Sequence, residues 1–394
     1  MLERYKNSSA KFLYAASFLI CIFSCVANSR DDKEQKRFPG LKTNTDKTLI
    51  DLSELGSGGV GKDGIPSINS PDFISIKNAK GWLKPNEPVI AVSIGTAAKA
   101  YPLQILIWHE MVNDTIKDVP VLVTFCPLCY SAVVFDRRIN RKTHSFGVSG
   151  LLRHSDMVMY DRTTESLWQQ FTGEAVVGDF VGETLKRLPG QIISFAQFAK
   201  AYPFGQVLSR KTGHKRRYGQ NPYKGYDDIN KTPFLYKGTT DPRLSPMEKV
   251  VGVKIGKSGK AYPYSVTRKK RVINDTIAGK AVVVLHTPGA ASALDAAIIS
   301  KSKQAGSTGV FGRKVDGRLL NFVFTGRKFQ DRETESVWDI TGTAVKGPLK
   351  GKHLEKIVYG DYFAFAWLAF RTDTEIYKYT GGGQEKNSKA KSQK

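Results

Sequence analysis

Two cysteines lie three positions apart in the segment TFCPLCYS, residues 124–131. Cys126 and Cys129 are two of only four cysteines in a chain of 394 residues. A Cys-x-x-Cys spacing brings two sulfur atoms close enough to interconvert between dithiol and disulfide, and it equally supplies two thiolate ligands to a metal ion. A purely structural staple is the weaker interpretation, because the loop-entropy model gives a disulfide over so short a loop only about 2 kcal/mol of stabilisation.

A histidine and a glutamate are candidates to assist the cysteines. His109 and Glu110 lie in LQILIWHEMV (103–112), which follows a proline and has apolar residues at helical spacing, so it predicts a helix. Glu110 falls on the apolar face of that helix, where a buried carboxylate needs a partner or a task. His109 is expected to stabilise a thiolate or relay its proton. It is also the preferred third ligand of a metal site, with Glu110, His144 and His154 as alternatives.

The residues leave three functions open. The first is a thiol-based redox site, which would make the protein a thiol oxidoreductase acting on a redox partner or small molecule. Thiol oxidoreductases with a Cys-Pro-x-Cys motif begin a helix at the first cysteine, whereas YSAVVFDRRI after Cys129 predicts a strand. The second is a zinc or copper site formed by Cys126, Cys129 and His109, with its fourth position open. The third is an envelope interaction module in which the cysteines are incidental.

The chain contains an internal repeat, which shows how the candidate residues are positioned. The matching segments are KAYP at 99–102 and 260–263, NDTI at 113–116 and 274–277, and DRTTESLW at 161–168 with DRETESVW at 331–338. We therefore predict two tandem copies of one module with pseudo-symmetry, at residues 70–204 and 249–380. A tyrosine-rich connector at 205–248 joins them.

The second copy lacks the residues that could do chemistry. The replacements are Lys270-Arg271 for His109-Glu110, Thr287 for Cys126 and Ala290 for Cys129, and FGVSGLLRHSD (146–156) has no clear counterpart. Residues present in both copies, such as Asn113-Asp114 and Asp161-Arg162, are explained by shared architecture. Residues that only the first copy has were not needed for folding. The first copy is thus expected to carry the site, and the second to be a degenerate support.

Within a copy, strands outnumber helices. VIAVSIGTAAKAYP alternates like a pair of strands, and VPVLVTF and SAVVFDRRI read as buried strands on either side of the cysteines. ISFAQFAKAY (193–202) predicts a helix near the end of the copy. The predicted fold class is α+β, predominantly β.

The N-terminus predicts export. Basic residues precede FLYAASFLICIF (12–23), an apolar run shorter than the roughly 20 residues that span a bilayer. IFSC resembles a lipobox, which predicts a signal peptide over 1–25 and lipidation at Cys25; cleavage after Ala27 is the alternative. We expect an exported protein anchored through lipid to the membrane of the cell envelope or periplasm. Cys126 and Cys129 are then the two thiols left in the folded body, which excludes a four-cysteine zinc site.

The remaining segments are polar or basic. Residues 26–69 are rich in polar residues and glycine and predict a tether, and residues 381–394 predict a basic disordered tail. The chain has 60 Lys and Arg against 36 Asp and Glu, a net charge of +24. No nucleic-acid-binding motif accompanies this charge, so it favours solvated basic loops and attraction to an anionic surface over nucleic acid.

Four segments together resemble the family of domain of unknown function 3179: KAYPLQILIWHEMVND, VTFCPLCYSAVVFDR, FGVSGLLRHSDMVMYDRTTESLWQQ and GKDGIPSI. The resemblance covers nearly all of the mature chain, and the family has no established activity. Its members include selenoproteins with selenocysteine in or near the cysteine motif, which implies redox or metal chemistry at Cys126 or Cys129. The resemblance also supports His109 and Glu110 as site residues, but it does not extend to a histidine at the position of His154.

Overall fold

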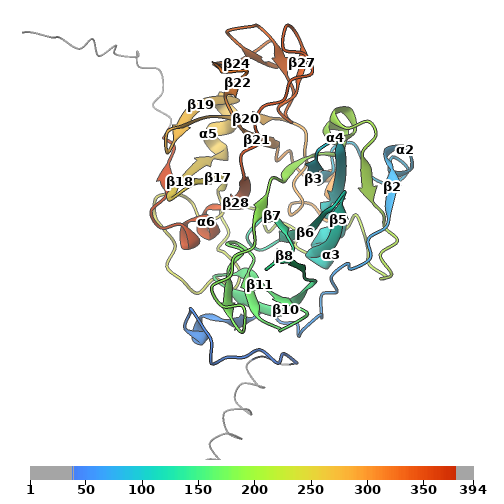
Figure 1. Cartoon of the computed structure of the whole chain (residues 1–394), viewed down its shortest axis with the longest axis vertical. Coiled ribbons are helices and arrows are strands. Elements are labelled where there is room, and N and C mark those ends of the chain that lie inside the picture. The colour runs from blue at the N-terminus through green and yellow to red at the C-terminus, as the bar shows by residue number, and fades with distance from the viewer. Residues whose placement is uncertain (1–37, 39, 379–394) are drawn as a thin grey trace, which may run out of the picture.

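The computed structural model describes residue 38 and residues 40–378, and it is predominantly β, which confirms the predicted class (Figure 1). The predicted signal peptide, Cys25 and the basic tail lie outside the described residues. Within these residues, no helix has the length and apolar sequence needed to cross a membrane. The helical segments are η1 (Leu52–Glu54), α2 (Ile76–Ala79), α3 (Leu103–His109), α4 (Phe195–Ala201), α5 (Tyr264–Lys270), η2 (Ile299–Lys301) and α6 (Ala364–Phe370).

The first half of the described chain forms three larger sheets and a small ribbon. The first sheet has the order β15-β3-β4-β16-β2, the second β14-β7-β6-β5, and the third β1-β10-β11-β12-β13, while β8 pairs with β9. Their bounds are β1 (Gly56–Ser57), β2 (Phe73–Ser75), β3 (Pro88–Ile94), β4 (Ala97–Pro102), β5 (Met111–Ile116), β6 (Val119–Cys126), β7 (Ser131–Asp136), β8 (Arg138–Ile139), β9 (Lys142–Thr143), β10 (Phe146–Arg153), β11 (Asp156–Asp161), β12 (Leu167–Gln169), β13 (Ala175–Val177), β14 (Arg187–Leu188), β15 (Gln191–Ser194) and β16 (Gln206–Leu208).

The second half has the sheets β28-β17-β18-β29, β19-β20-β21 and β24-β25-β26-β27, with the ribbon β22-β23. Its strands are β17 (Lys249–Ile255), β18 (Ser258–Pro263), β19 (Val272–Ile277), β20 (Lys280–Thr287), β21 (Ser307–Gly312), β22 (Lys314–Val315), β23 (Arg318–Leu319), β24 (Phe322–Thr325), β25 (Lys328–Asp331), β26 (Val337–Trp338), β27 (Ala344–Lys346), β28 (Tyr359–Phe363) and β29 (Glu375–Ile376).

The same order of elements occurs in both halves. The hairpin β3–β4 leads into α3 and the hairpin β5–β6, and the hairpin β17–β18 leads into α5 and the hairpin β19–β20. In both halves the second strand of the first hairpin also pairs in parallel with a strand near the end of the half, β16 or β29. The strand pair predicted from VIAVSIGTAAKAYP is therefore confirmed, as is the helix predicted over 193–202, which is α4.

Polar residues shared by the two halves make the same hydrogen bonds. The hydroxyl of Tyr101 donates to Asp114 at 2.6 Å, and that of Tyr262 donates to Asp275 at 2.8 Å. The indole of Trp168 donates to Asp161 at 3.1 Å, as the indole of Trp338 does to Asp331 at 2.9 Å. These residues satisfy one another inside the fold, as expected for architecture.

The helix predicted over 103–112 ends earlier, at His109. Glu110 has φ 58, and its amide donates to Leu106 O at 2.7 Å. The chain then enters β5, where Met111 pairs with Thr124. The apolar residues keep helical spacing up to residue 112, but residues 111 and 112 pair with β6 as part of a strand instead of forming a last helical turn. Arg271 at the end of α5 has the same left-handed conformation, with φ 64.

Two segments differ between the halves. Residues 127–130 form a tight turn between β6 and β7, whereas residues 288–306 form a long loop between β20 and β21. The hairpin β10–β11 is also longer than β24–β25, and it has a register shift between Val148 and Leu151. The halves therefore differ at the turn that carries Cys129 and at the hairpin β10–β11.

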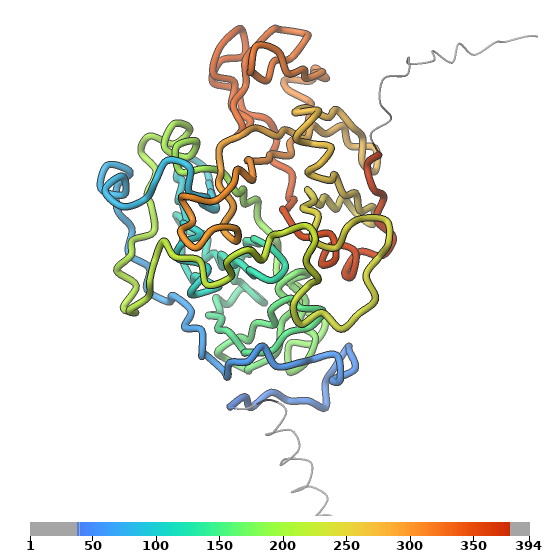
Figure 2. Tube along the Cα trace, turned by 180° about the vertical axis from the view of Figure 1, so that it is seen from behind, coloured from blue at the N-terminus to red at the C-terminus, as the bar shows by residue number. Residues whose placement is uncertain are grey.

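One apolar core joins the halves. It contains residues of β5, β6 and β7 together with Tyr226 of the connector and Phe363, Phe365 and Trp367 of the second half. Figure 2 shows the connector crossing from one half to the other, beside the loop 288–306. Residues 40–69, predicted as part of a tether, instead pack on the first half, where Leu41 and Leu55 are buried in a cluster with Val158.

Candidate functional site

The two cysteines lie at the end of a β-hairpin. Cys126 is the last residue of β6 and pairs with Ser131, the first residue of β7. The turn between them is closed by the amide of Tyr130, which donates to Pro127 O at 3.3 Å, and Tyr130 adopts φ 53. Cys126 and Cys129 are free thiols with no exposed surface. The turn thus presents both sulfur atoms inside the protein, without the helix found at this position in many thiol oxidoreductases.

A carboxylate from the longer hairpin completes the cluster. Asp156 begins β11, and its carboxylate lies with the sulfur atoms of Cys126 and Cys129 so that the ligand atoms are all within 4.8 Å of one another. Its Oδ2 accepts hydrogen bonds from Gln169 Nε2 at 2.6 Å and from the amide of Phe171 at 2.9 Å. These bonds, with one from Ser131 Oγ to Oδ1 at 3.3 Å, hold the carboxylate in place beside the thiols.

Burial raises the affinity of this cluster for protons. It raises the pKa of Asp156 to about 7, even though hydrogen bonds from Gln169 and other groups oppose the shift. It also raises the pKa of Glu110 to about 8, with a further contribution from the charge of Asp156. Burial, the neighbouring Cys126 and the Asp156 carboxylate all raise the pKa of Cys129. The two carboxyls therefore hold protons that can be released near neutral pH, whereas the raised pKa of Cys129 keeps its thiol protonated there.

Glu110 enters the site from the end of α3. Its carbonyl accepts the amide of Phe125 at 2.7 Å, which ties it to the strand that leads into Cys126. The left-handed backbone is not specific to the site, because Arg271 has it in the half without cysteines. The side chain is specific to the first half, because Glu110 has a carboxyl where Arg271 of the second half has a guanidinium. The predicted burial of Glu110 is confirmed.

His109 makes its contacts with residues outside the cysteine cluster. Its Nδ1 lies 2.7 Å from Pro66 O, its Nε2 lies 2.7 Å from Tyr218 Oη, and its ring lies beside His214. Burial lowers the pKa of His109 to about 4, so the imidazole is neutral at physiological pH. Cys126, Cys129 and Glu110 lie in one region. His109 instead helps α3 to pack against the segments that contain Pro66 and Tyr218.

The other two histidines considered as ligands also have other partners. His144 Nδ1 lies 3.0 Å from Thr163 Oγ1, and its ring packs against Phe180. His154 lies at the tip of the β10–β11 hairpin, with Nε2 3.5 Å from Glu54 Oε2 and its ring against Phe370. Neither belongs to the group of ligand atoms around Asp156, in the part of the chain that the structure describes.

A second layer of polar side chains surrounds the cluster. Ser131 Oγ donates to Gln170 Oε1 at 2.8 Å, and Gln170 Nε2 donates to Thr124 Oγ1 at 2.8 Å. Ser131 also reaches Asp156 at 3.3 Å. The Oε1 atom of Gln169 is buried and has no hydrogen-bond partner among the described residues. This layer links β6, β7 and β12, and one acceptor remains unused beside the site.

The tyrosine-rich connector covers the turn. The hydroxyl of Tyr226 donates to Leu128 O at 3.1 Å and accepts the amide of Phe234 at 3.1 Å. Ser155 Oγ donates to Phe234 O at 2.6 Å, so the hairpin tip beside Asp156 is held to the same cover. From the second half, the amide of Phe363 donates to Cys129 O at 2.9 Å. The site is therefore enclosed by three parts of the chain.

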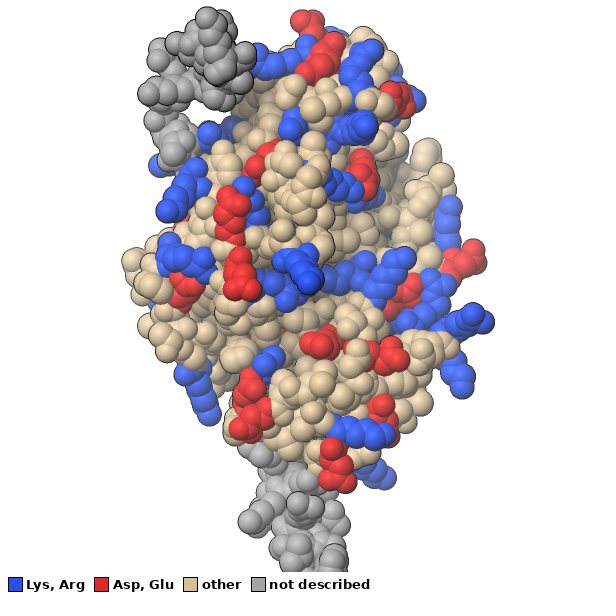
Figure 3. Space-filling view, turned by 60° about the vertical axis from the view of Figure 1, so that its left-hand side comes forward, with Lys and Arg blue, Asp and Glu red and all other residues tan. Residues whose placement is uncertain are grey.

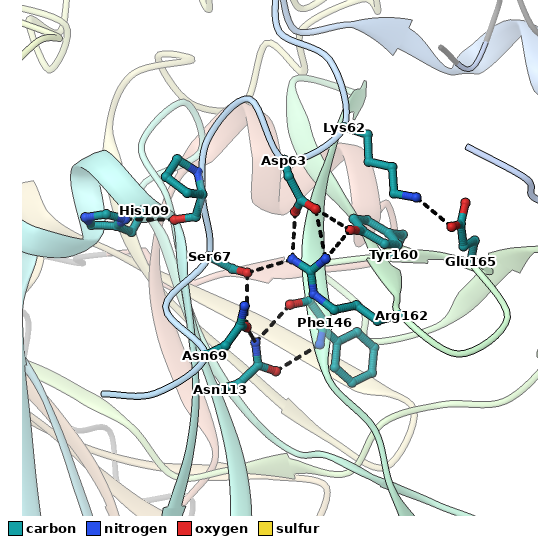
Figure 4. A network of polar contacts seen from close by, with 11 residues as sticks. Lys62, Asp63, Ser67, Asn69, His109, Asn113, Phe146, Tyr160, Arg162 and Glu165 are labelled. Atoms are coloured by element: carbon teal, nitrogen blue, oxygen red, sulfur yellow. Dashed lines mark hydrogen bonds and ion pairs between the residues drawn. The ribbon is translucent and has the colours of Figure 1, made fainter. Parts of the chain in front are cut away.

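The segment GKDGIPSI fastens the N-terminal part of the first half to β11 (Figure 4). Asp63 binds Arg162 at 2.7 Å and accepts the hydroxyl of Tyr160 at 2.6 Å, and Lys62 pairs with Glu165 at 2.5 Å. The carbonyl of Pro66 in the same segment contacts His109. The family model described as "Protein of unknown function (DUF3179)" begins here and matches residues 62–374.

The chain belongs to this family. The membership confirms the resemblance seen in the motifs, and the matched residues include the whole cluster. No curated protein and no solved structure matches the chain. The family description names no activity, so a function has to be argued from the site itself.

Sequence reasoning missed Asp156 and the two glutamines after Trp168. Two signals in the family motifs could have found them. Asp156 closes FGVSGLLRHSD, the segment without a clear counterpart in the second half. Gln169 and Gln170 follow a tryptophan present in both halves, but the second half has Asp339 and Ile340 there. The informative pattern was a buried polar residue in the first half that the second half does not keep.

Proposed function

We propose that Cys126 and Cys129 form a redox-active dithiol and that Asp156 is the proton acceptor for Cys129. The observation that carries the proposal is the position of the Asp156 carboxylate against both sulfur atoms. A thiolate is the reactive form of cysteine, and burial disfavours it. A neighbouring base with a pKa near 7 is well matched to removing such a proton at neutral pH.

The proposed reaction is exchange with a small disulfide. One thiolate of the pair attacks a sulfur of the disulfide R–S–S–R, a mixed disulfide forms, and one R–S⁻ leaves. The second thiolate then attacks the protein sulfur of the mixed disulfide, forms the Cys126–Cys129 bond and releases the second R–S⁻. Two electrons pass from the cysteines to the substrate, and the two cysteine protons end on the two released thiols. Asp156 holds the proton of Cys129 during the second step.

Glu110 gives the site a second carboxyl. The charge of Asp156 acts on Glu110 and raises its pKa, so the two do not ionise together near neutral pH. The pair can therefore take up or deliver one proton without placing two negative charges in a buried site. Enclosure by the connector suits a small substrate better than a folded protein partner.

The test is the rate at which the full chain reduces a small chromogenic disulfide, measured from pH 5 to pH 9. The wild type is expected to release two thiolates per chain, with a rise in rate near pH 7. Asp156→Asn should lower the rate by about 10²-fold or more and remove that rise. Glu87→Gln is the matched control, because Glu87 is also buried with a raised pKa but lies outside the cluster. Equal rates in all three proteins would reject the role of Asp156.

A metal site is the second candidate, and the same cluster favours it. Two thiolates and a carboxylate are a suitable set for zinc, and the charge of Asp156 acts on the nearby Glu110. The hydrogen bonds from Gln169 and Phe171 would orient the carboxylate ligand. Metal content and free thiols measured on one sample separate the two candidates. One equivalent of zinc or copper that is lost in Cys126→Ser would replace the dithiol proposal with a metal site.

We also propose that the halves arose by duplication of one module and that the second copy has lost the chemistry. The repeated motifs and the recurring Tyr–Asp and Trp–Asp hydrogen bonds support this. Export and lipid attachment at Cys25 are part of the same proposal, supported by the N-terminal sequence. Mass spectrometry of the N-terminal peptide from the native membrane fraction tests the attachment, since an unmodified Cys25 would contradict it.

A further inference from the structure

A hollow lies on the second half of the molecule, lined by residues outside the cysteine cluster. The turn of the β17–β18 hairpin and residues 370–374 after α6 enclose a space of about 180 Å³. This is room for several water molecules or a small ion, since a water occupies about 30 Å³ in the liquid. Figure 3 shows the face that carries β17, β18 and α6, where Lys and Arg side chains gather across the middle.

Three cationic side chains line the hollow: Lys254, Lys257 and Arg371. None of them has a salt bridge within the described residues, which include many ion pairs elsewhere, such as Lys260 with Asp275. The guanidinium of Arg371 has one hydrogen bond, from Nη1 to Phe370 O at 3.0 Å. The positive charges of the hollow are thus left without carboxylate partners at contact distance.

These charges repel one another. The charge of Arg371, burial and the charge of Arg187 together lower the pKa of Lys254. Burial and Arg187 lower the pKa of Arg371. Glu174 opposes both effects without forming an ion pair, and Asp373 is the one acidic residue in the lining. Like charges held close together are unfavourable unless an anion lies between them.

A buried donor next to the cluster has no partner. Arg187 donates from Nη2 to the hydroxyl of Tyr362 at 2.6 Å, but its Nε is buried and makes no hydrogen bond within the described residues. A buried guanidinium nitrogen without a hydrogen bond carries a larger free-energy penalty than a neutral donor without one. Arg187 therefore adds both positive charge and an unused donor to the same region.

We propose that this hollow binds a small oxyanion, a phosphate or carboxylate group of a soluble molecule. Guanidinium groups bind such oxygens through paired hydrogen bonds, and lysines add charge at the rim. The bound anion would relieve the repulsion among Lys254, Arg371 and Arg187. The inference does not rest on the dithiol proposal, because no residue of the hollow belongs to the cysteine cluster.

The experiment is a thermal unfolding titration of the full chain with inorganic phosphate, with sodium chloride at matched ionic strength as the reference. The wild type is expected to gain stability in a saturable way beyond the chloride series. The variant Lys254→Gln/Arg371→Gln should lose that gain. The control Lys346→Gln/Lys350→Gln removes two exposed lysines of the same half and should keep it.

The outcomes decide the proposal. Equal stabilisation of the wild type and the hollow variant, or none beyond the chloride series, would overturn it. Lys254→Gln alone guards against a folding defect, because Lys254 is exposed and the substitution should weaken phosphate binding at least threefold in a folded protein. An acetate arm separates carboxylate from phosphate selectivity. Vesicles containing phosphatidate form a last arm, and binding to them that phosphate cannot compete away would contradict a soluble ligand.

Discussion

The two halves of this protein have the same frame and differ at one end of it. In both, a tyrosine hydroxyl binds an aspartate on the next hairpin, and a tryptophan indole binds an aspartate near the end of the third sheet. Around the hairpin end that carries Cys126 and Cys129, the agreement stops. The second half has a long loop between the corresponding strands, in which Ala293 and Leu294 are buried.

This difference separates architecture from site better than burial alone does. Tyr101 and Asp156 are both fully buried and hydrogen-bonded, yet the second half has a counterpart only for Tyr101. Since the second half folds without a carboxylate at the position of Asp156, folding does not explain that residue. The comparison therefore supports our proposal that the polar groups of the cysteine cluster serve a function.

The largest expected effect is the loss of the thiols from one half. Cys126→Ser/Cys129→Ser is predicted to abolish reduction of a small disulfide, because no other described residue is a thiol. The matched change in the second half, Thr287→Ser/Ala290→Ser, should leave the rate unchanged. The measurement is the thiolate released per chain. Activity that persists in Cys126→Ser/Cys129→Ser would contradict the proposal that the first half carries the redox site.

Loss of the shared tyrosine–aspartate hydrogen bond should lower stability by a similar amount in the two halves. Tyr101→Phe and Tyr262→Phe each remove a hydroxyl that donates to a buried or partly buried aspartate, and each should lower the free energy of unfolding by about 1–3 kcal/mol. Neither should change the rate of disulfide reduction once the protein is folded. Denaturant titration gives the first quantity, and a large loss of rate in Tyr101→Phe alone would mean that this residue belongs to the site.

Glu110 and Asp156, both in the first half, should make the protein less stable as pH rises. Glu110 and Asp156 have pKa values of about 8 and about 7 in the folded protein, above their ordinary values of 4.5 and 3.8. Between pH 4 and 8 these two carboxyls have lost protons in the unfolded chain that they keep in the folded chain, so their contribution to the free energy of unfolding decreases with pH. His109, whose pKa is lowered to about 4, opposes this decrease below about pH 6.5. The slope is at most about 1.4 kcal/mol per pH unit for each group.

The matched variant sharpens that prediction. Asp156→Asn/Glu110→Gln removes both titrating carboxyls, so the decrease between pH 4 and 8 should flatten. Arg271→Gln, at the position of Glu110 in the second half, should leave the wild-type slope in place. Denaturant titrations at four pH values give the slopes. A wild-type slope that the double variant keeps would show that other groups produce it.

The smallest expected effect on the site is that of His109. His109→Gln should leave the rate of disulfide reduction within about twofold, because the ring contacts Pro66 and Tyr218 and not the cysteines. It should lower stability by about 1 kcal/mol through those lost hydrogen bonds. A drop in rate comparable to that of Asp156→Asn would mean that His109 acts in the site, as its position next to Glu110 in the sequence predicts.

Much of this arrangement could be predicted from the sequence. Apolar runs predicted buried strands on either side of the cysteines, and β6 and β7 confirm them. The replacements in the second half led us to expect the site in the first half, which stays a prediction. Glu110 was expected to be buried and is buried. These features depend on local periodicity or on a comparison within the chain, both of which a single sequence contains.

The contacts of the site could not be predicted in the same way. Asp156 lies at the end of the β10–β11 hairpin, which has a register shift between Val148 and Leu151 and is longer than β24–β25. Bulges and hairpin lengths are set by pairing in three dimensions, which sequence spacing does not report. The direction of His109 likewise follows from where α3 ends, and strand pairing with β6 decides that.

The most direct measurement is the redox state of the two cysteines at equilibrium. The full chain would be held in buffers of increasing oxidising strength, alkylated, and digested so that the peptide containing Cys126 and Cys129 can be weighed. The account predicts a reversible change of two electrons between a doubly alkylated dithiol and an unalkylated Cys126–Cys129 disulfide, in protein free of bound metal. A peptide that stays in one form across the whole range, or stoichiometric metal that keeps both thiols from alkylation, would contradict it.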